Sequence, residues 1–233
     1  MKQQFCIFAL LFILLPYGAN AQKQKTFQGT ISYTMQTEYG DKNISSYATC
    51  YYSNKYNKIS ADIYGINLQL IQDLALDSTT LLINAMGNKI AVPLPIHQAD
   101  DSAGINLGDM LSTDTICNYN CQKYLVFHGA LSDTDINNMP SNTLSNGILQ
   151  NAEVNIWVYL SKDICIRNIL SGTLPLPKDE AILQIEMEQT DIRVKITATD
   201  IKPCKLSDKE FQIDKSYKYI TLALLQEYLK WLR

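Results

Sequence analysis

The sequence predicts a mainly β protein, a curved antiparallel sheet or incomplete β-barrel with an amphipathic C-terminal helix. Apolar and polar residues alternate with a period of two in about eleven short segments at even spacing. Gly, Asn and Asp residues separate these segments, as in antiparallel strands joined by tight turns. The final residues change to a helical spacing.

The first half of the chain predicts a series of hairpins. In residues 31–36, Ile, Tyr and Met alternate with Ser, Thr and Gln, which is typical of a half-buried strand. A turn at 40–43 leads to a returning strand at 46–53. The later strands of this half are expected at 58–63, 67–73, 79–84 and 89–94, with turns at 65, 77–78 and 86–88.

The second half is less regular. Residues 96–112 are polar and predict irregular structure, and 132–151 predict a long loop. Strands are expected at 115–127 (with a break at 118–120), 153–160, 164–170, 180–190 and 192–201. A tight hairpin tip is expected at 188–191, because the apolar residues on its two sides mirror each other.

Residues 220–232 predict an amphipathic helix, and Lys230 and Arg233 in its last turn suit the negative end of its dipole. We interpret it as packed on the sheet; the alternative is a lid over a groove.

Residues 1–21 have the pattern of a secretory signal peptide, removed after Ala21. Its apolar core, residues 5–15, is too short to span a membrane, although an uncleaved anchor is the alternative. Gln22 at the expected cut argues against a lipid anchor. We therefore expect one β-rich domain at 22–233 in a soluble, exported protein, periplasmic or extracellular.

The charge of the expected mature chain is mild. Without Lys2 it has 19 Lys and Arg against 23 Asp and Glu, so its formal charge is about −4. Nucleic acid and anionic membranes are not expected partners. No later segment has eighteen consecutive apolar residues, so no transmembrane anchor is expected after cleavage.

Residues 115–124 resemble a segment of a family of secreted envelope proteins of unknown function. Tyr119, Cys121 and Tyr124 match its Gly-Tyr-x-Cys-x-x-Tyr pattern, and Asn118 replaces the glycine. Asparagine, like glycine, accepts a positive φ. Members of this family resemble the LolA/LolB lipoprotein carriers in fold.

Three further segments support the resemblance in the same order. They are 27–33, resembling the first strand of the family, 153–158 with Trp157, and 211–217, where Asp214 replaces a proline. Trp157 followed by 172–176 is also similar to GLPGLI-type secreted proteins. The resemblance implies a curved sheet, with acyl chains on the concave face in the carriers, and it implies no catalytic residue.

Five cysteines remain after signal cleavage. In a straight strand, Cys117 and Cys121 would be about 13 Å apart, so they can bond only if residues 118–120 bulge or turn. A disulfide, buried free thiols, and metal or redox work all stay open. The candidate disulfide cysteines are Cys50, Cys117, Cys121, Cys165 and Cys204.

The histidines suggest no enzyme. His97 with Asp100 and Asp101 could ligate a metal, but solvated loop residues explain this motif better. His128 marks the end of a strand. No motif of a hydrolase, metalloprotease or nucleotide-binding protein is present, so we expect no catalytic residue, no metal and no cofactor.

The aliphatic strand faces are the remaining candidate site. A single curved sheet with one helix cannot cover such a face, so part of it must contact the helix, a partner or a ligand. The sequence thus predicts a non-enzymatic binding or carrier protein for a lipid or acylated protein. The alternatives are a filled core and a structural or interaction protein that binds another envelope component. The candidate groove residues are Ile31, Tyr33, Met35, Ile156, Trp157, Val158, Leu183 and Ile185.

Overall fold

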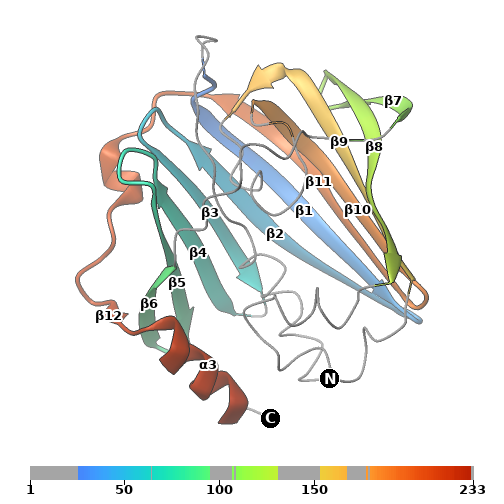
Figure 1. Cartoon of the computed structure of the whole chain (residues 1–233). Coiled ribbons are helices and arrows are strands. Elements are labelled where there is room, and N and C mark those ends of the chain that lie inside the picture. Colours follow the sequence, from blue (N-terminus) through green and yellow to red (C-terminus); the bar gives the residue numbers. More distant parts are fainter. Residues whose placement is uncertain are drawn as a thin grey trace.

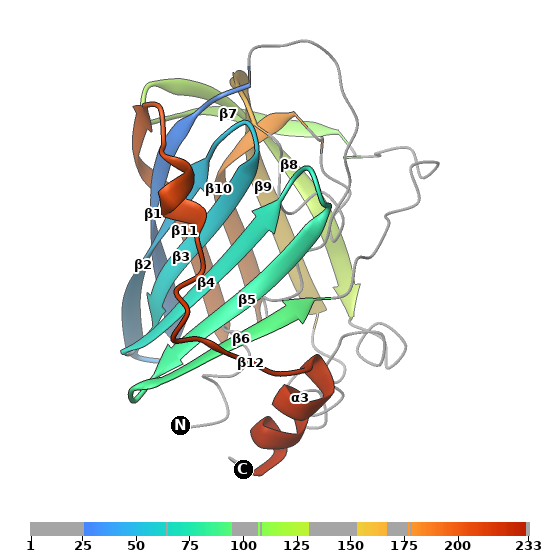
Figure 2. The ribbon, with the colours of Figure 1, turned by 90° about the vertical axis from the view of Figure 1, so that its left-hand side faces the viewer.

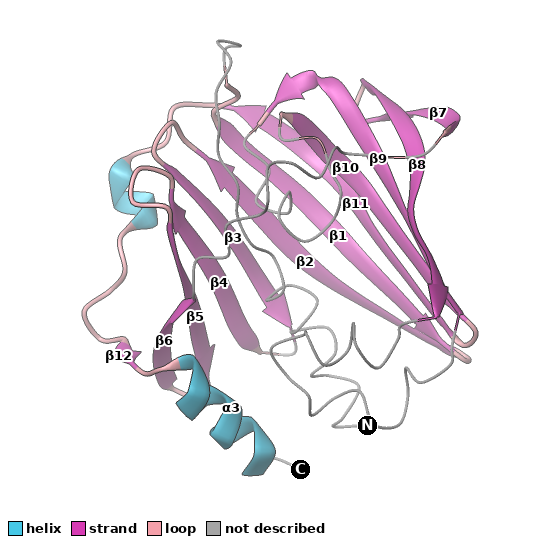
Figure 3. Cartoon of the chain, viewed as in Figure 1, coloured by secondary structure: helices cyan, strands magenta, loops and turns pink. Residues whose placement is uncertain are grey.

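The described residues form one large, curved and open β-sheet (Figures 1 and 3). The structure, a computed structural model, describes residues 26–63, 65–94, 107, 109–130, 153–166, 177 and 179–231. The twelve strands lie in the order β12-β6-β5-β4-β3-β2-β1-β11-β10-β9-β8-β7. The predicted fold class, a curved antiparallel sheet with a C-terminal helix, is confirmed.

The strands and helices have the following bounds. The first group is β1 (Gly29–Tyr39), β2 (Lys42–Tyr52), β3 (Tyr56–Ile63), β4 (Ile66–Asp73), β5 (Ser78–Ala85) and β6 (Asn88–Leu94). The second group is β7 (Met110–Ile116), β8 (Tyr119–Ala130), β9 (Glu153–Cys165), β10 (Glu180–Gln189) and β11 (Ile192–Pro203). The chain then forms the 3-10 helix η1 (Asp208–Phe211), β12 (Lys218–Tyr219) and α3 (Leu222–Trp231).

Two antiparallel meanders, β1–β6 and β7–β11, meet where β1 pairs with β11. This junction involves every residue of β1. At its start Gly29 has φ +148°, and a Cβ atom there would collide with the carbonyl oxygen of Lys202. A glycine is therefore required where the two meanders join.

The β7–β8 hairpin differs from the sequence prediction. Its two-residue turn is Cys117-Asn118, with φ +50° and +67°, as a type I′ turn requires. The break thus lies one residue before the expected 118–120. Strand β7 begins at Met110, inside the region predicted to be irregular. The first six residues of β7 are exposed, so it has no alternation to reveal a strand.

The inner face of the sheet, which carries Ile31, Tyr33 and Met35, holds the main apolar core. The outer face of β3–β6 is covered by the segment from η1 to β12, which runs across it in Figure 2. Phe211 is the buried anchor of this segment. Strand β12 then pairs in parallel with β6 and covers that edge of the sheet.

Helix α3 lies within the predicted 220–232 and packs beside β6. Leu225 is buried in the main core, and Leu222 and Leu224 pack against it. Neither helix of the described chain has both the length and the apolar character that crossing a membrane requires.

Candidate functional site

The candidate site is the apolar inner face where β1, β11, β10 and β9 lie side by side. The strand register places Met35 opposite Ile196, Ile196 opposite Ile185, and Ile185 opposite Val158. Directly paired residues share a face of the sheet, so these four side chains form one apolar row. Met35 is 6% exposed and Val158 has no exposed surface.

Six of the eight predicted groove residues belong to two apolar clusters. Ile31, Tyr33, Met35 and Leu183 belong to the main core. Val158 and Ile185 belong to a second cluster with Leu160 and Ile182, against which Leu107 packs. Ile156 is half-buried and pairs with Met187.

Trp157 differs from the other candidates because it lies on the outer face. The register pairs Trp157 with Glu186, Glu186 with Lys195, and Lys195 with Gln36 of β1. These four side chains therefore lie on the same face of the sheet. Successive side chains of a strand point to opposite faces, so Trp157 cannot share a face with its neighbours in the sequence. Its ring instead lies 5.1 Å from Nζ of Lys123.

The inner face includes more residues than the groove residues predicted from the sequence. Strands β2, β3 and β4 contribute further buried residues to the main core, namely Ala48, Cys50, Ile59, Ala61, Ile63, Leu68 and Leu70. Their period-two alternation is visible in the sequence and could have identified them.

A small polar group lies inside the main core. The Tyr33 hydroxyl donates a hydrogen bond of 2.8 Å to the carbonyl oxygen of Ile182, two strands away. Burial raises the pKa of Tyr33 well above its ordinary value, and it raises the pKa of the Cys50 thiol to about 12. Both groups are therefore neutral at physiological pH and suited to an apolar surface.

Charged side chains gather on the outer face of β8–β10. Lys123 lies 2.8 Å from a carboxylate oxygen of Glu186, which also accepts a hydrogen bond from the Tyr159 hydroxyl. Gln184 donates to the other oxygen of the same carboxylate. Burial raises the pKa of Glu186, but the hydrogen bond and charge of Lys123 outweigh it, so the pKa lies below its ordinary value. The carboxylate is fully partnered, which suits a structural network better than acid–base catalysis.

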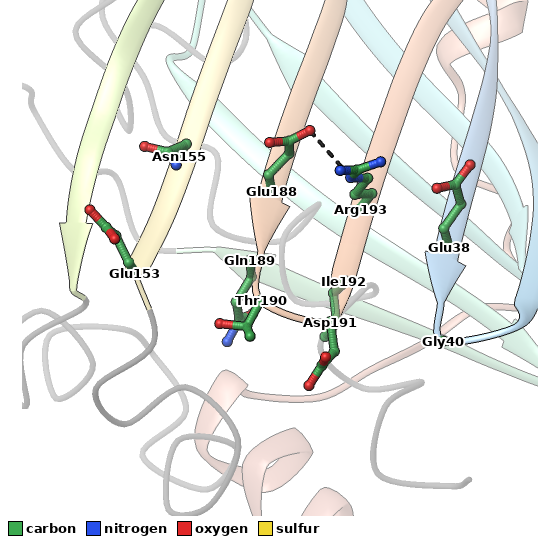
Figure 4. Close-up of a pocket in the computed structure, with 10 residues that line it drawn as sticks. All are labelled: Glu38, Gly40, Glu153, Asn155, Glu188, Gln189, Thr190, Asp191, Ile192 and Arg193. Carbon is green, nitrogen blue, oxygen red and sulfur yellow. Dashed lines mark ion pairs between the residues drawn. The ribbon is translucent and has the colours of Figure 1, made fainter.

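A polar hollow of about 510 Å³ lies where β1, β9, β10 and β11 approach their turns (Figure 4). Its charged lining residues are Glu38, Glu153, Glu188, Asp191 and Arg193. Arg193 lies 3.3 Å from Glu188, as the dashed line in Figure 4 marks. This acidic, polar surface does not suit an acyl chain, which favours the inner face as the apolar site.

All five candidate cysteines are free thiols in this structure. Cys117 lies in the β7–β8 turn, where its thiol donates to the carbonyl oxygen of Ala198 at 3.2 Å. Cys121 is buried on β8, and burial raises the pKa of its thiol to about 11. Cys165 is the last residue of β9, and Cys204 directly follows β11.

Of the two histidines considered in the sequence analysis, the structure describes His128 and not His97. His97, Asp100 and Asp101 lie outside the described residues, as does the expected signal peptide. His128 lies near the end of β8, where Nδ1 is 2.6 Å from Asn155 and Nε2 is 3.3 Å from Glu153. Within the described ranges, no group of three or more His, Cys, Asp or Glu residues could hold a metal ion.

No protein-family model matches the chain, and no curated protein matches its sequence. Among solved structures it is similar to PNGF-II, with 12% identity and a TM-score of 0.46. That similarity covers 87% of this chain but 33% of PNGF-II, so the chain spans a third of that protein's length.

Two smaller proteins are similar over most of both chains. The LolA superfamily protein NE2245 from Nitrosomonas europaea has 11% identity and a TM-score of 0.36, over 82% of this chain and 93% of that one. LprF from Mycobacterium bovis has 10% identity and a TM-score of 0.34, over 88% and 94%. The LolA-like proteins indicated by the sequence are thus also among the structural neighbours. All three TM-scores are below 0.5, so the function has to be argued from the residues of this chain.

Proposed function

We propose that this protein is an exported, non-enzymatic carrier or binding protein for a hydrophobic ligand, a lipid or the acyl chains of a lipoprotein. The ligand binds the inner face, along the row of Met35, Ile196, Ile185 and Val158. The export part of the proposal rests on the pattern of a signal peptide in residues 1–21, which predicts release into the periplasm or the extracellular space.

The observation that supports this proposal best is the size of the apolar face relative to its helix. Eleven paired strands at about 4.8 Å spacing extend about 48 Å along the curve of the sheet. Helix α3 has ten residues, so it is about 15 Å long, and it packs beside β6. This helix therefore cannot cover the part of the face formed by β1 and β9–β11.

The burial of the inner face sets a condition on binding. Ile31 and Val158 have no exposed surface. A ligand that contacts them must therefore separate groups that now cover them. Uptake should slow the hydrogen exchange of backbone amides in β1 and β9, because the ligand excludes water from the separated groups.

Native mass spectrometry of protein purified from its own envelope tests the proposal. We expect a bound species with the mass of a lipid or an acylated peptide, which organic extraction removes. The extracted protein should then take up a fluorescent fatty acid in a saturable manner. A mature chain that carries no lipid and takes up no fatty acid would be inconsistent with the proposal.

The alternative function is interaction with another protein of the envelope and no small-molecule ligand. The exposure of the edge strand β7 is the observation that favours it. The two functions separate experimentally, since only the first requires uptake of an apolar molecule.

A further inference from the structure

Strand β7 forms one end of the sheet, and among the described residues no other strand pairs with its outward edge. It pairs with β8 alone, whereas the opposite end of the sheet is covered by β12. In Figure 1, β7 lies at the margin of the sheet beyond β8. An uncovered edge can pair with another extended chain through its free backbone groups.

The type I′ turn determines which backbone groups of β7 point outward. Ile116 and Tyr119 flank the two-residue turn, so the amide and carbonyl of Ile116 face β8. The backbone groups of neighbouring residues point to opposite sides of a strand, so those of Thr113 and Thr115 point away from β8. The Thr115 N–H is bonded to the carboxylate of Asp114 at 2.7 Å. The Thr113 backbone groups have no partner on this side among the described residues.

The side chains of β7 have few of the features that protect natural edges. Met110 and Leu111 are 50% and 54% exposed, and all residues before Ile116 are exposed. The strand contains no proline, lysine or arginine, and Asp114 is its one charged residue. Its protective features are Asp114 and an irregular register between Met110 and Ser112.

We propose that β7 is a self-association surface, on which β7 of a second copy of this chain pairs antiparallel about a two-fold axis at Thr113. This arrangement places Thr113 opposite Thr113, Ser112 opposite Asp114, and Leu111 opposite Thr115. The two Asp114 carboxylates are not opposite each other, and each faces a hydroxyl that can donate to it. The sequence of β7 is thus complementary to itself, as a two-fold interface requires.

The proposed interface is small, so the association is weak. One pair of edge strands buries less than about 1,200 Å², the range of transient contacts. Sedimentation should therefore be measured on the mature chain (residues 22–233) from about 1 μM to about 1 mM. We expect a reversible monomer–dimer equilibrium within this range.

A charge swap at the axis tests the geometry. In a dimer of Thr113→Lys, two lysine charges lie directly opposite each other, and in a dimer of Thr113→Glu two carboxylates do. Each variant should therefore dimerise at least tenfold more weakly than the unmodified chain. An equal mixture of the two variants should dimerise again, because the opposite charges now face each other. Thr190→Lys, which makes the same change at the exposed β10–β11 turn, should leave the association unchanged.

Hydrogen exchange of the unmodified chain gives a second, independent measurement. The Thr113 and Thr115 amides should exchange more slowly at high protein concentration, while the amide of Gly87, in the exposed β5–β6 turn, should not change. A chain that stays monomeric up to about 1 mM, or a Thr113→Lys variant that dimerises as strongly as the unmodified chain, would overturn the proposal. Fatty-acid uptake by the monomer is independent of these results.

Discussion

Phe211 should be a main anchor of the segment that crosses the outer face of the sheet. Its side chain is 4% exposed and contacts Ile71, Leu82 and Ala91. Its ring stacks on Tyr56 with the centroids 5.4 Å apart. Beside it, the Lys58 ammonium donates to the carbonyl oxygen of Glu210 and lies 4.2 Å from the centroid of the Tyr51 ring.

We expect Phe211→Ala to lower the free energy of unfolding by about 3 kcal/mol. Replacing a buried phenylalanine by alanine costs about 3–5 kcal/mol, and the lower end applies because a cluster near the surface can partly collapse. Urea unfolding of the mature chain, followed by far-ultraviolet circular dichroism, measures the change.

Phe211→Leu is the matched control and should cost less than about 1.5 kcal/mol, because it keeps most of the apolar volume. A loss below about 1 kcal/mol for Phe211→Ala, with an unchanged denaturant slope, would refute the role of Phe211 as an anchor.

Two further predictions concern titratable groups. The pKa of Glu186 lies below its ordinary value of 4.5, so its ion pair stabilises the fold above that pH and is lost as the pH falls through the lower, folded value. Glu186→Gln should therefore lower the melting temperature at pH 7, and the difference from the unmodified chain should shrink below about pH 4.5; an equal difference at both pH values would contradict this role. The Cys50 thiol, buried and with its pKa raised to about 12, should react with a thiol reagent only after unfolding, whereas the exposed Cys204 should react in the native chain. Thiol titration with and without urea tests this, and rapid native modification of Cys50 would argue against its burial.

The meander from β1 to β6 could be predicted from the sequence because its strands have one buried, apolar face and one more exposed, polar face. Ile31, Tyr33 and Met35 alternate with polar residues, and their burial follows that alternation. Asparagine accepts a positive φ, and Asn118 has φ +67° in the β7–β8 turn.

The parts that sequence analysis missed depend on contacts between distant segments. Strand β7 is exposed on both sides, and the two residues of β12 become a strand only because the chain returns to the edge of β6. Phe211 is buried through contacts with β3–β6, far away in the sequence. Trp157 lies between apolar residues in the sequence, but the alternation of a strand places it on the opposite face from Ile156 and Val158.

Fatty-acid binding by a matched pair of variants tests the central claim most directly. Ile196→Glu puts a carboxylate into the apolar row of the inner face, and Gln36→Glu makes the same charge change on the exposed outer face. If the inner face binds the acyl chain, Ile196→Glu should weaken binding at least tenfold while Gln36→Glu leaves it unchanged, because burying an unpaired charge against the ligand costs more than about 1.4 kcal/mol. Equal binding by both folded variants, or no uptake by the delipidated unmodified chain, would contradict the account.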